Sequence, residues 1–173
     1  MRNCSVRDLT LAAVVAALYV VMGYFGNIFG LTFGSVQFRF AEALTVLPFL
    51  YPATGPGLAI GCLIVNLASP VGPLDIVFGT LATAVAAWLT MKMPRWYLAA
   101  LPPIVMNALL LPPMWAWATT GAVNGAFWAA YGLNLWTFVV GEAVACYVLG
   151  TVLLRALPEV KYFRPMIPAA RLS

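Results

Sequence analysis

Eight polar side chains lie in or beside segments of the sequence that are otherwise apolar, and these residues have the chemistry to bind a ligand. Three are acids, one is an arginine and four are amides: Glu42, Asp75, Glu142, Arg39, Gln37, Asn66, Asn107 and Asn134. Carboxylates accept hydrogen bonds, amides donate and accept them, and a guanidinium donates. The chain contains no histidine and no nucleophile motif, so an enzyme is the weakest interpretation. The set favours binding of a polar small molecule.

The composition indicates that these groups are set in a membrane protein. Of 173 residues, 64% are hydrophobic and only 8% are charged, and the mean hydropathy is +0.96. This proportion of charged side chains is too low to cover the surface of a soluble globule of this size. Most of the outer surface must therefore face lipid. The basic balance does not imply nucleic acid, because lysine and arginine in a membrane protein mainly report which loops stay in the cytoplasm.

Turn-forming residues divide the chain into six predicted helices in one transmembrane domain, residues 1–173. The predicted helices are residues 8–26, 38–52, 55–69, 74–92, 95–112 and 125–156, followed by a cytoplasmic tail at 157–173. The second and third are shorter than the ~20 residues of an ordinary span, and a re-entrant hairpin is the alternative. Six spans are preferred because Pro52 and Pro56 suit a turn at the membrane surface. The predicted fold is an all-α integral membrane protein, a bundle of six transmembrane helices.

The basic residues predict the orientation of this bundle. A cytoplasmic N-terminus places every lysine and arginine except Arg39 on the inner side, and it also makes the C-terminus cytoplasmic. In that topology the eight polar residues gather in the outer half of the bundle, except Glu142, which lies near the middle of the last helix. The sequence therefore predicts a polar pocket that is open to the outside.

Each polar residue also has an interpretation that involves no ligand. Arg39 and Glu42 are three residues apart and either neutralise each other or contact a ligand. Asp75 follows Gly72 and Pro73 at a helix start, where a carboxylate is favourable to the helix dipole. The amides either bridge helices or bind ligand. Glu142 is the strongest candidate, because no basic residue lies within one helical turn of it.

Aromatic and small residues add two further candidate surfaces. Five aromatic residues lie at the predicted outer end of the last two helices: Trp115, Trp117, Trp128, Tyr131 and Trp136. Most of them are expected to anchor the chain at the membrane interface, and one or two are candidates to stack on a flat ligand. The first helix carries two pairs of small residues four apart. Ala12 with Ala16, or Ala13 with Ala17, provides the spacing that lets another helix approach closely in lipid.

Several familiar motifs are missing from the sequence. It has no GxxxxGK[ST] phosphate loop, no HExxH and no CxxC, so the chain has no evident means of using ATP itself. Its three cysteines, Cys4, Cys62 and Cys146, are widely spaced and are expected to be small buried residues, not disulfide or zinc ligands. We therefore expect no metal and no cofactor.

Five stretches of this sequence resemble the QueT family, the substrate-binding S components of energy-coupling factor (ECF) transporters for queuosine precursors. The stretches are VQFRFAEALTVLPF at 36–49, GLAIGCLIVNL at 57–67, DIVFGTLAT at 75–83, LPPIVMNAL at 101–109 and GEAVACYVLG at 141–150. The Trp-rich stretch at 112–124 matches the family least well. The resemblance implies a six-helix S component in the bacterial cytoplasmic membrane. It also implies partners: a transmembrane coupling subunit, which contacts an AxxxA motif on the first helix, and two cytoplasmic ATPases.

The resemblance also implies a ligand, a 7-deazaguanine such as preQ0, preQ1 or queuine. The substrate-binding candidates are then Gln37, Arg39, Glu42, Asn66, Asp75, Asn107 and Glu142. The acids would accept hydrogen bonds from the N–H groups of the ligand, and the amides Gln37, Asn66 and Asn107 would contact its carbonyl group and ring edge. The docking candidates are Ala12, Ala13, Ala16 and Ala17. Two alternatives stay open, an S component for another vitamin or nucleobase and an autonomous proton-coupled transporter.

Overall fold

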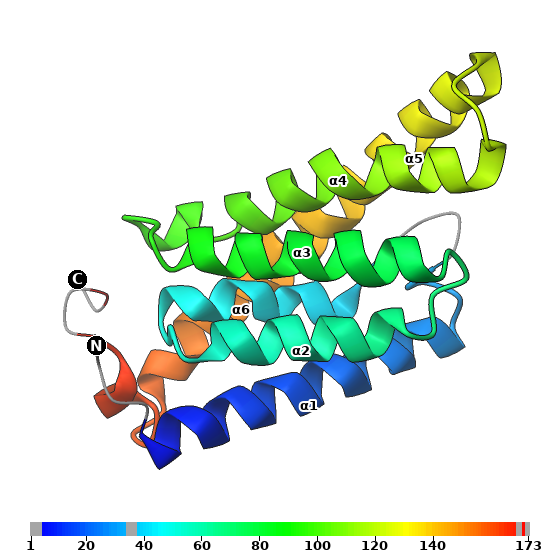
Figure 1. The fold of residues 1–173 in the computed structure, drawn as a ribbon. Coiled ribbons are helices and arrows are strands. Elements are labelled where there is room, and N and C mark those ends of the chain that lie inside the picture. Colours follow the sequence, from blue (N-terminus) through cyan, green and yellow to red (C-terminus); the bar gives the residue numbers. More distant parts are fainter. Residues whose placement is uncertain (1–4, 34–37, 169–170, 172–173) are drawn as a thin grey trace.

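The helical architecture predicted from the sequence is confirmed. The computed structural model describes residues 5–33, 38–168 and 171, and within them every regular element is a helix. The elements discussed below are α1 (Val6–Ile28), η1 (Phe40–Phe49), α2 (Thr54–Asn66), α3 (Pro73–Thr90), α4 (Leu101–Thr120), α5 (Gly125–Ala143), η3 (Val144–Leu149) and α6 (Gly150–Ala156). The long helices lie side by side in one elongated bundle (Figure 1).

Four helical stretches of the described chain are long and apolar enough to cross a membrane. They are Val6–Ile28, Pro73–Thr90, Trp96–Thr120 and Gly125–Glu159. The other two apolar helices, η1 and α2, have 10 and 13 residues, which gives each a length of about 20 Å, compared with ~30 Å for the hydrocarbon core of a bilayer. Six membrane crossings therefore remain a prediction.

The distribution of side chains is the reverse of that in a soluble protein. Large apolar residues such as Ile28, Leu109 and Trp136 are more than 60% exposed on the outside of the bundle. By contrast, Glu42 and Asp75 are fully buried inside it. Such an arrangement is stable where lipid surrounds the protein and the polar groups face the interior of the bundle.

The short element η1 runs through the middle of the bundle. It contacts α1, α2, α3, α4, η3 and α6, and every residue from Ala41 to Phe49 is buried. The predicted helix over 38–52 is thus confirmed as helical but is of the 3-10 type and contains Pro48. A helix of this type rises more steeply per residue than an α-helix. Its weaker backbone hydrogen bonding is tolerated at membrane depth because protein surrounds it.

Helices α1 and α2 pack closely because glycines on α2 face the backbone of α1. A Cβ atom at Gly57 would lie 2.2 Å from the carbonyl oxygen of Ala12, and one at Gly61 would lie 2.9 Å from that of Ala16. Glycine at both positions is therefore required for this approach. The same face of α1 carries Tyr19 into the interior, where it is 1% exposed.

The predicted helix 95–112 starts close to the observed helical stretch Trp96–Thr120 but ends too early. A short 3-10 turn at Trp96–Leu98 precedes α4, and α4 continues through Pro112 and Pro113 to Thr120. Proline usually marks a helix end, but membrane bundles tolerate it where neighbouring helices surround the freed carbonyl groups. The helix ends at Gly121, which has a φ of 67° and so adopts a conformation that favours glycine. Most of the Trp-rich stretch 112–124 is consequently helical.

The predicted last helix, 125–156, is present but is not uniform. The segment η3, between α5 and α6, is a π-helix. Single π turns inside α-helices are rare and are frequent at functional sites. This one begins two residues after Glu142, and it ends at Gly150, where a Cβ atom would lie 3.0 Å from Val46 of η1. The wider turn therefore occurs where the last helix meets η1.

The start of α1 and the chain beyond α6 lie at the same end of the bundle (Figure 1). Arg171 donates hydrogen bonds to the carbonyl groups of Met91 and Met93, just after α3 ends. A cation at a helix C-terminus is favourable, because the last carbonyl groups lack partners within the helix. Arg171 of the predicted tail is thus held against the bundle, and the cytoplasmic location of the tail remains a prediction.

Candidate functional site

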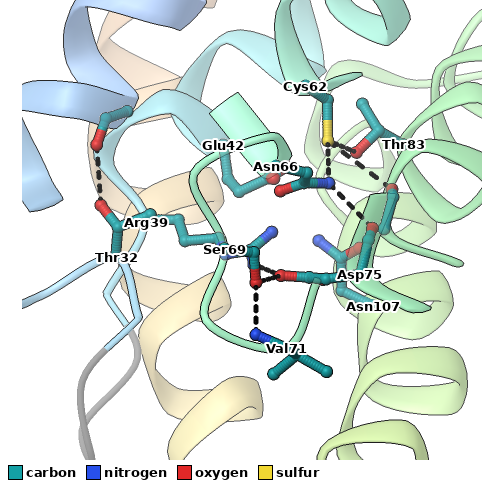
Figure 2. Close-up of polar contacts among 12 residues, drawn as sticks. Thr32, Arg39, Glu42, Cys62, Asn66, Ser69, Val71, Asp75, Thr83 and Asn107 are labelled. Carbon is teal, nitrogen blue, oxygen red and sulfur yellow. Dashed lines mark hydrogen bonds and ion pairs between the residues drawn. The ribbon is translucent and has the colours of Figure 1, made fainter. Parts of the chain in front are cut away.

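Six of the seven predicted substrate-binding residues lie in the described part of the chain, and all six are buried. Their exposed fractions are 0% for Glu42, Asn66 and Asp75, 1% for Asn107, 3% for Glu142 and 5% for Arg39. They come from η1 and its N-terminal cap, α2, α3, α4 and α5. Figure 2 shows five of these side chains converging between the helices: Arg39, Glu42, Asn66, Asp75 and Asn107. We call these six residues the buried polar site; Gln37 lies outside the described residues.

Arg39 pairs with Asp75 and not with Glu42. Its guanidinium Nη2 lies 3.5 Å from Asp75 Oδ2, which also accepts a hydrogen bond of 2.6 Å from Ser69. Because Arg39 precedes η1 in an extended conformation, its side chain crosses to the start of α3. The direct ion pair between Arg39 and Glu42 that their spacing suggests is therefore not formed.

Glu42 has a different partner, which the sequence did not identify. The hydroxyl of Tyr19 on α1 donates to Glu42 Oε1 at 2.5 Å. A hydrogen bond to a carboxylate is among the stronger kinds in proteins. The second carboxylate oxygen, Oε2, has no partner in the described structure. One oxygen of Glu42 is therefore held, and the other is free to accept from a ligand.

Glu142 lies next to the same region from the opposite side. Asn107 Nδ2 donates to Glu142 Oε1 at 2.8 Å, so α4 and α5 are connected by this pair. The Cys146 thiol lies 3.7 Å from Glu142 Oε2 and 3.4 Å from the main-chain carbonyl oxygen of Glu42. This one small side chain thus contacts both acidic residues, which places them close together in the bundle.

Asn66 occupies the end of α2 and is held against the start of α3. Its amide nitrogen donates to the main-chain carbonyl of Asp75 at 3.1 Å and to the Cys62 sulfur at 3.3 Å. The neighbouring Gly79 leaves room for this amide, because a Cβ atom there would lie 2.5 Å from Asn66 Nδ2 and 3.0 Å from Asp75 Oδ1. The amide oxygen of Asn66 remains unpartnered.

The most informative feature of the site is a set of buried polar atoms without hydrogen-bond partners in the described structure. Four are acceptor oxygens, on Glu42, Asn66, Asp75 and Asn107, and two are N–H donors, Arg39 Nε and Trp115 Nε1. Most buried polar groups in proteins are satisfied, and each exception costs ~1–3 kcal/mol. So many exceptions close together make this region the candidate site for a polar ligand.

The structure separates the five outer aromatic residues into two groups. Trp117, Trp128 and Trp136 are 49–69% exposed, as expected of side chains that face lipid or its interface, and Tyr131 is partly exposed. Trp115 is only 8% exposed. Its ring stacks on Phe33 at a centroid distance of 6.5 Å and an interplanar angle of 17°. Phe33 in turn lies 5.5 Å from the Arg39 guanidinium, so Trp115 is connected to the edge of the site.

The predicted pocket is not open at the buried polar site, because the six side chains of that site are at most 5% exposed. A cavity of about 480 Å³ lies elsewhere, between α1, η1 and the chain around residues 153–166, and its lining is mainly apolar. None of the six residues of the buried polar site lines this cavity. The site therefore represents a closed arrangement, and Asn134, which is only partly buried, is not part of it.

Sequence reasoning missed three residues that contact the site: Tyr19, Ser69 and Cys146. Tyr19 lies in a long apolar run and Ser69 in a connecting turn, so neither has a local pattern that predicts a buried partner. Cys146 is four residues after Glu142, and that spacing places both on one face of a helix. This signal was present in the sequence.

The four docking alanines separate into an inner and an outer pair. The inner pair, Ala12 and Ala16, is half-buried and packs its backbone on the glycines of α2. The outer pair, Ala13 and Ala17, is exposed. Only the outer pair remains available to another helix.

These features define a class: an α-helical membrane protein with a cluster of buried polar side chains between its helices. The family model described as QueT transporter matches residues 9–159, and the chain belongs to this transporter family. The queuosine precursor transporter QueT of Lactococcus lactis subsp. cremoris (strain MG1363) is 32% identical over 85 residues, which are 49% of this chain and 50% of that protein. The alignment thus spans half the length of this relative. No solved structure matches the chain.

Proposed function

We propose that this chain is the substrate-binding subunit of an ECF-type importer and that the buried polar site binds a 7-deazaguanine precursor of queuosine. The observation that carries the proposal is a set of unpartnered polar atoms, namely four acceptors and the Arg39 donor at the site and the Trp115 donor at its edge. Membership of the QueT transporter family and the name of the Lactococcus relative support the ligand class.

The hydrogen-bonding groups of a 7-deazaguanine complement this set. The base offers four donor hydrogens, on N1, on the exocyclic amino group and on the pyrrole nitrogen, and two main acceptors, the carbonyl oxygen and N3. Free acceptor oxygens on Glu42, Asn66, Asp75 and Asn107 suit those donors, and the free N–H groups of Arg39 and Trp115 suit the acceptors. We propose that the ligand satisfies these groups when it binds.

Ligand exchange requires movement, because the six side chains are at most 5% exposed. We propose that substrate enters from the outer side of the membrane, as the distribution of basic residues suggests. Both termini are then cytoplasmic, at the end of the bundle where α1 starts. Segments around the site must separate during entry, as is common for closed binding sites.

The proposed partners are a transmembrane coupling subunit and two cytoplasmic ATPases. The sequence has no phosphate-binding loop of its own, so energy from ATP must come from another subunit. The outer pair, Ala13 and Ala17, gives α1 an exposed strip of small residues on which a partner helix can pack closely. We propose this strip as the docking surface.

Two measurements test the proposal. Purified protein is titrated with 7-cyano- and 7-aminomethyl-7-deazaguanine, queuine and guanine, and we expect a nanomolar dissociation constant for at least one 7-deazaguanine and much weaker binding of guanine. Uptake is then measured in cells with and without the coupling subunit and the ATPases. Absence of binding to every 7-deazaguanine would overturn the ligand, and tight binding of a different vitamin or base would favour the other S-component function.

An autonomous proton-coupled transporter is a second candidate, favoured by one observation. Glu42 and Glu142 are buried acids, and Cys146 contacts the main-chain carbonyl oxygen of the first and the carboxylate of the second. Buried acids that lie close together are typical of proton relays in transporters. In that case uptake would occur with this chain alone and a proton uncoupler would abolish it. The proposed function predicts instead that uptake requires the partner subunits.

A further inference from the structure

The buried polar site contains more negative than positive charge. Glu42, Asp75 and Glu142 are the buried acids of the described chain, at 0%, 0% and 3% exposure, and Arg39 is its buried base, at 5%. The other basic residues of the described chain are exposed, apart from the partly exposed Arg171, which binds carbonyl groups after α3. With every group ionised, three acids and one base give the site a formal charge of −2.

The one buried base is committed to one acid. Arg39 lies 3.5 Å from Asp75, and no other ion pair is found in the residues that the structure describes. Glu42 and Glu142 accept hydrogen bonds only from neutral donors, namely Tyr19, Asn107 and the Cys146 thiol. These two carboxylates therefore have no cation of their own among the described side chains.

A buried carboxylate without a cation is unfavourable, because burial removes the water that would otherwise solvate it. Glu42 also retains one oxygen, Oε2, with no hydrogen-bond partner. The Cys146 thiol lies 3.7 Å from the Glu142 carboxylate and 3.4 Å from the main-chain carbonyl oxygen of Glu42, so a positively charged group placed near it would meet acceptor oxygens of both residues. A cationic ligand would then satisfy the free oxygen and reduce the excess negative charge at once.

We infer that the site selects 7-deazaguanines that carry a positive charge on the 7-substituent, and that Glu42 and Glu142 receive this ammonium group. The inference rests on the proposed function and narrows it. A 7-aminomethyl group is protonated at neutral pH, as is the secondary amine of queuine, whereas a 7-cyano group is neutral. The ring edge is then left to Asn66, Asp75 and Asn107, and the charged substituent to the two glutamates.

The test compares two ligands of similar size that differ in this charge. Dissociation constants of 7-aminomethyl- and 7-cyano-7-deazaguanine are measured by titration calorimetry on the purified full-length chain and on the variant Glu142→Gln. We expect the aminomethyl compound to bind wild-type protein about 10- to 100-fold more tightly. Glu142→Gln should reduce this preference to a few-fold. Glu159→Gln, which changes an exposed acid, is the control and should keep the full preference.

The outcomes are distinguishable. Equal or tighter binding of the cyano compound to wild-type protein would overturn the charge selection and leave the proposed function intact; it would indicate that the two acids are neutral or bind through hydrogen bonds alone. A preference that survives in both Glu42→Gln and Glu142→Gln would overturn the role of these residues. If neither compound nor queuine binds, the proposed function itself fails. The comparison on wild-type protein decides the inference even if a variant does not fold.

Discussion

Replacing Gly79 by alanine should damage the binding site without greatly changing the stability of the fold. The new Cβ atom would lie 2.5 Å from Asn66 Nδ2 and 3.0 Å from Asp75 Oδ1, both far inside normal contact distance. Asn66 is at the end of α2 and fully buried, so its amide has little space into which it can move. We expect the amide to turn away from Asp75.

Two opposing effects set the change in the free energy of unfolding. Displacement of Asn66 weakens its hydrogen bonds of 3.1 Å to the Asp75 carbonyl and 3.3 Å to the Cys62 sulfur, at about 1 kcal/mol for the stronger bond. Replacement of glycine by alanine within α3 contributes ~0.5–1 kcal/mol in favour of the helix. The two nearly cancel, so we expect a small net destabilisation of about 1 kcal/mol or less.

For the affinity for the ligand, no opposing effect offsets the loss of contacts. The oxygen of Asn66 and the Oδ1 oxygen of Asp75 are both proposed ligand contacts, and the new methyl group disturbs both. Loss of one or two hydrogen bonds corresponds to about 1–3 kcal/mol, and 1.4 kcal/mol is a tenfold change in dissociation constant. We therefore expect the best-binding 7-deazaguanine to bind at least tenfold more weakly to Gly79→Ala.

The assay is titration calorimetry together with thermal unfolding of the purified protein in detergent. Gly132→Ala is the matched control, because Gly132 is also helical, in α5, and a Cβ atom there would meet no atom within 4 Å. The control should gain slightly in stability and keep the wild-type dissociation constant. Wild-type affinity in Gly79→Ala would refute the assignment of Asn66 and Asp75 to the ligand.

Three further predictions concern the contacts around the site and the docking surface. Arg39→Gln should lower the free energy of unfolding by ~3–5 kcal/mol, because it leaves the Asp75 carboxylate buried and unpaired. The double variant Arg39→Gln with Asp75→Asn should recover much of the lost stability. Wild-type ligand affinity in the double variant would contradict a ligand contact by these two residues. Tyr19→Phe should lower the free energy of unfolding by ~1–3 kcal/mol, because Glu42 loses its donor at 2.5 Å; an unchanged midpoint of thermal unfolding would contradict this. Ala17→Trp should abolish co-purification with the coupling subunit and leave ligand binding intact. Ala16→Trp should instead reduce stability, because it disturbs the packing of α1 against α2. Equal effects of the two variants would argue against a docking surface on the outer pair of alanines.

Much of the architecture could be predicted because hydropathy is a property of whole segments. A run of apolar residues long enough to cross a membrane indicates a helix whatever its neighbours are, and a carboxylate within such a run must be buried among helices. The burial of Glu42, Asp75 and Glu142 follows from these two rules. The sequence therefore predicts that these acids lie in the interior of the bundle, as the structure shows.

The pairing of these residues could not be predicted, because it depends on how distant segments meet. Arg39 and Asp75 are 36 positions apart, and Tyr19 and Glu42 are 23 positions apart. Local spacing instead suggested an Arg39–Glu42 pair, but Arg39 lies before η1 in an extended conformation and its side chain pairs with Asp75. The continuation of α4 through Pro112 and Pro113 could not be predicted for the same reason. The two prolines are a local signal for a helix end, and tertiary packing overrides that signal.

The type of helix was equally hidden from the sequence. Ten residues of 3-10 helix in η1 and the π turn of η3 both occur where these two elements contact each other. Long 3-10 runs are intrinsically unfavourable, and this one is stabilised by burial from Ala41 to Phe49 on all sides. Such burial is a product of the assembled bundle.

The central claim is that a 7-deazaguanine binds at the buried polar site, and one binding experiment tests it most directly. The purified chain and the variant Asn107→Ala are titrated with 7-aminomethyl- and 7-cyano-7-deazaguanine and queuine. The account predicts nanomolar binding of at least one of them to the wild-type chain, weakened at least tenfold in Asn107→Ala. No binding to the wild-type chain, or equal affinity in the variant, would contradict it.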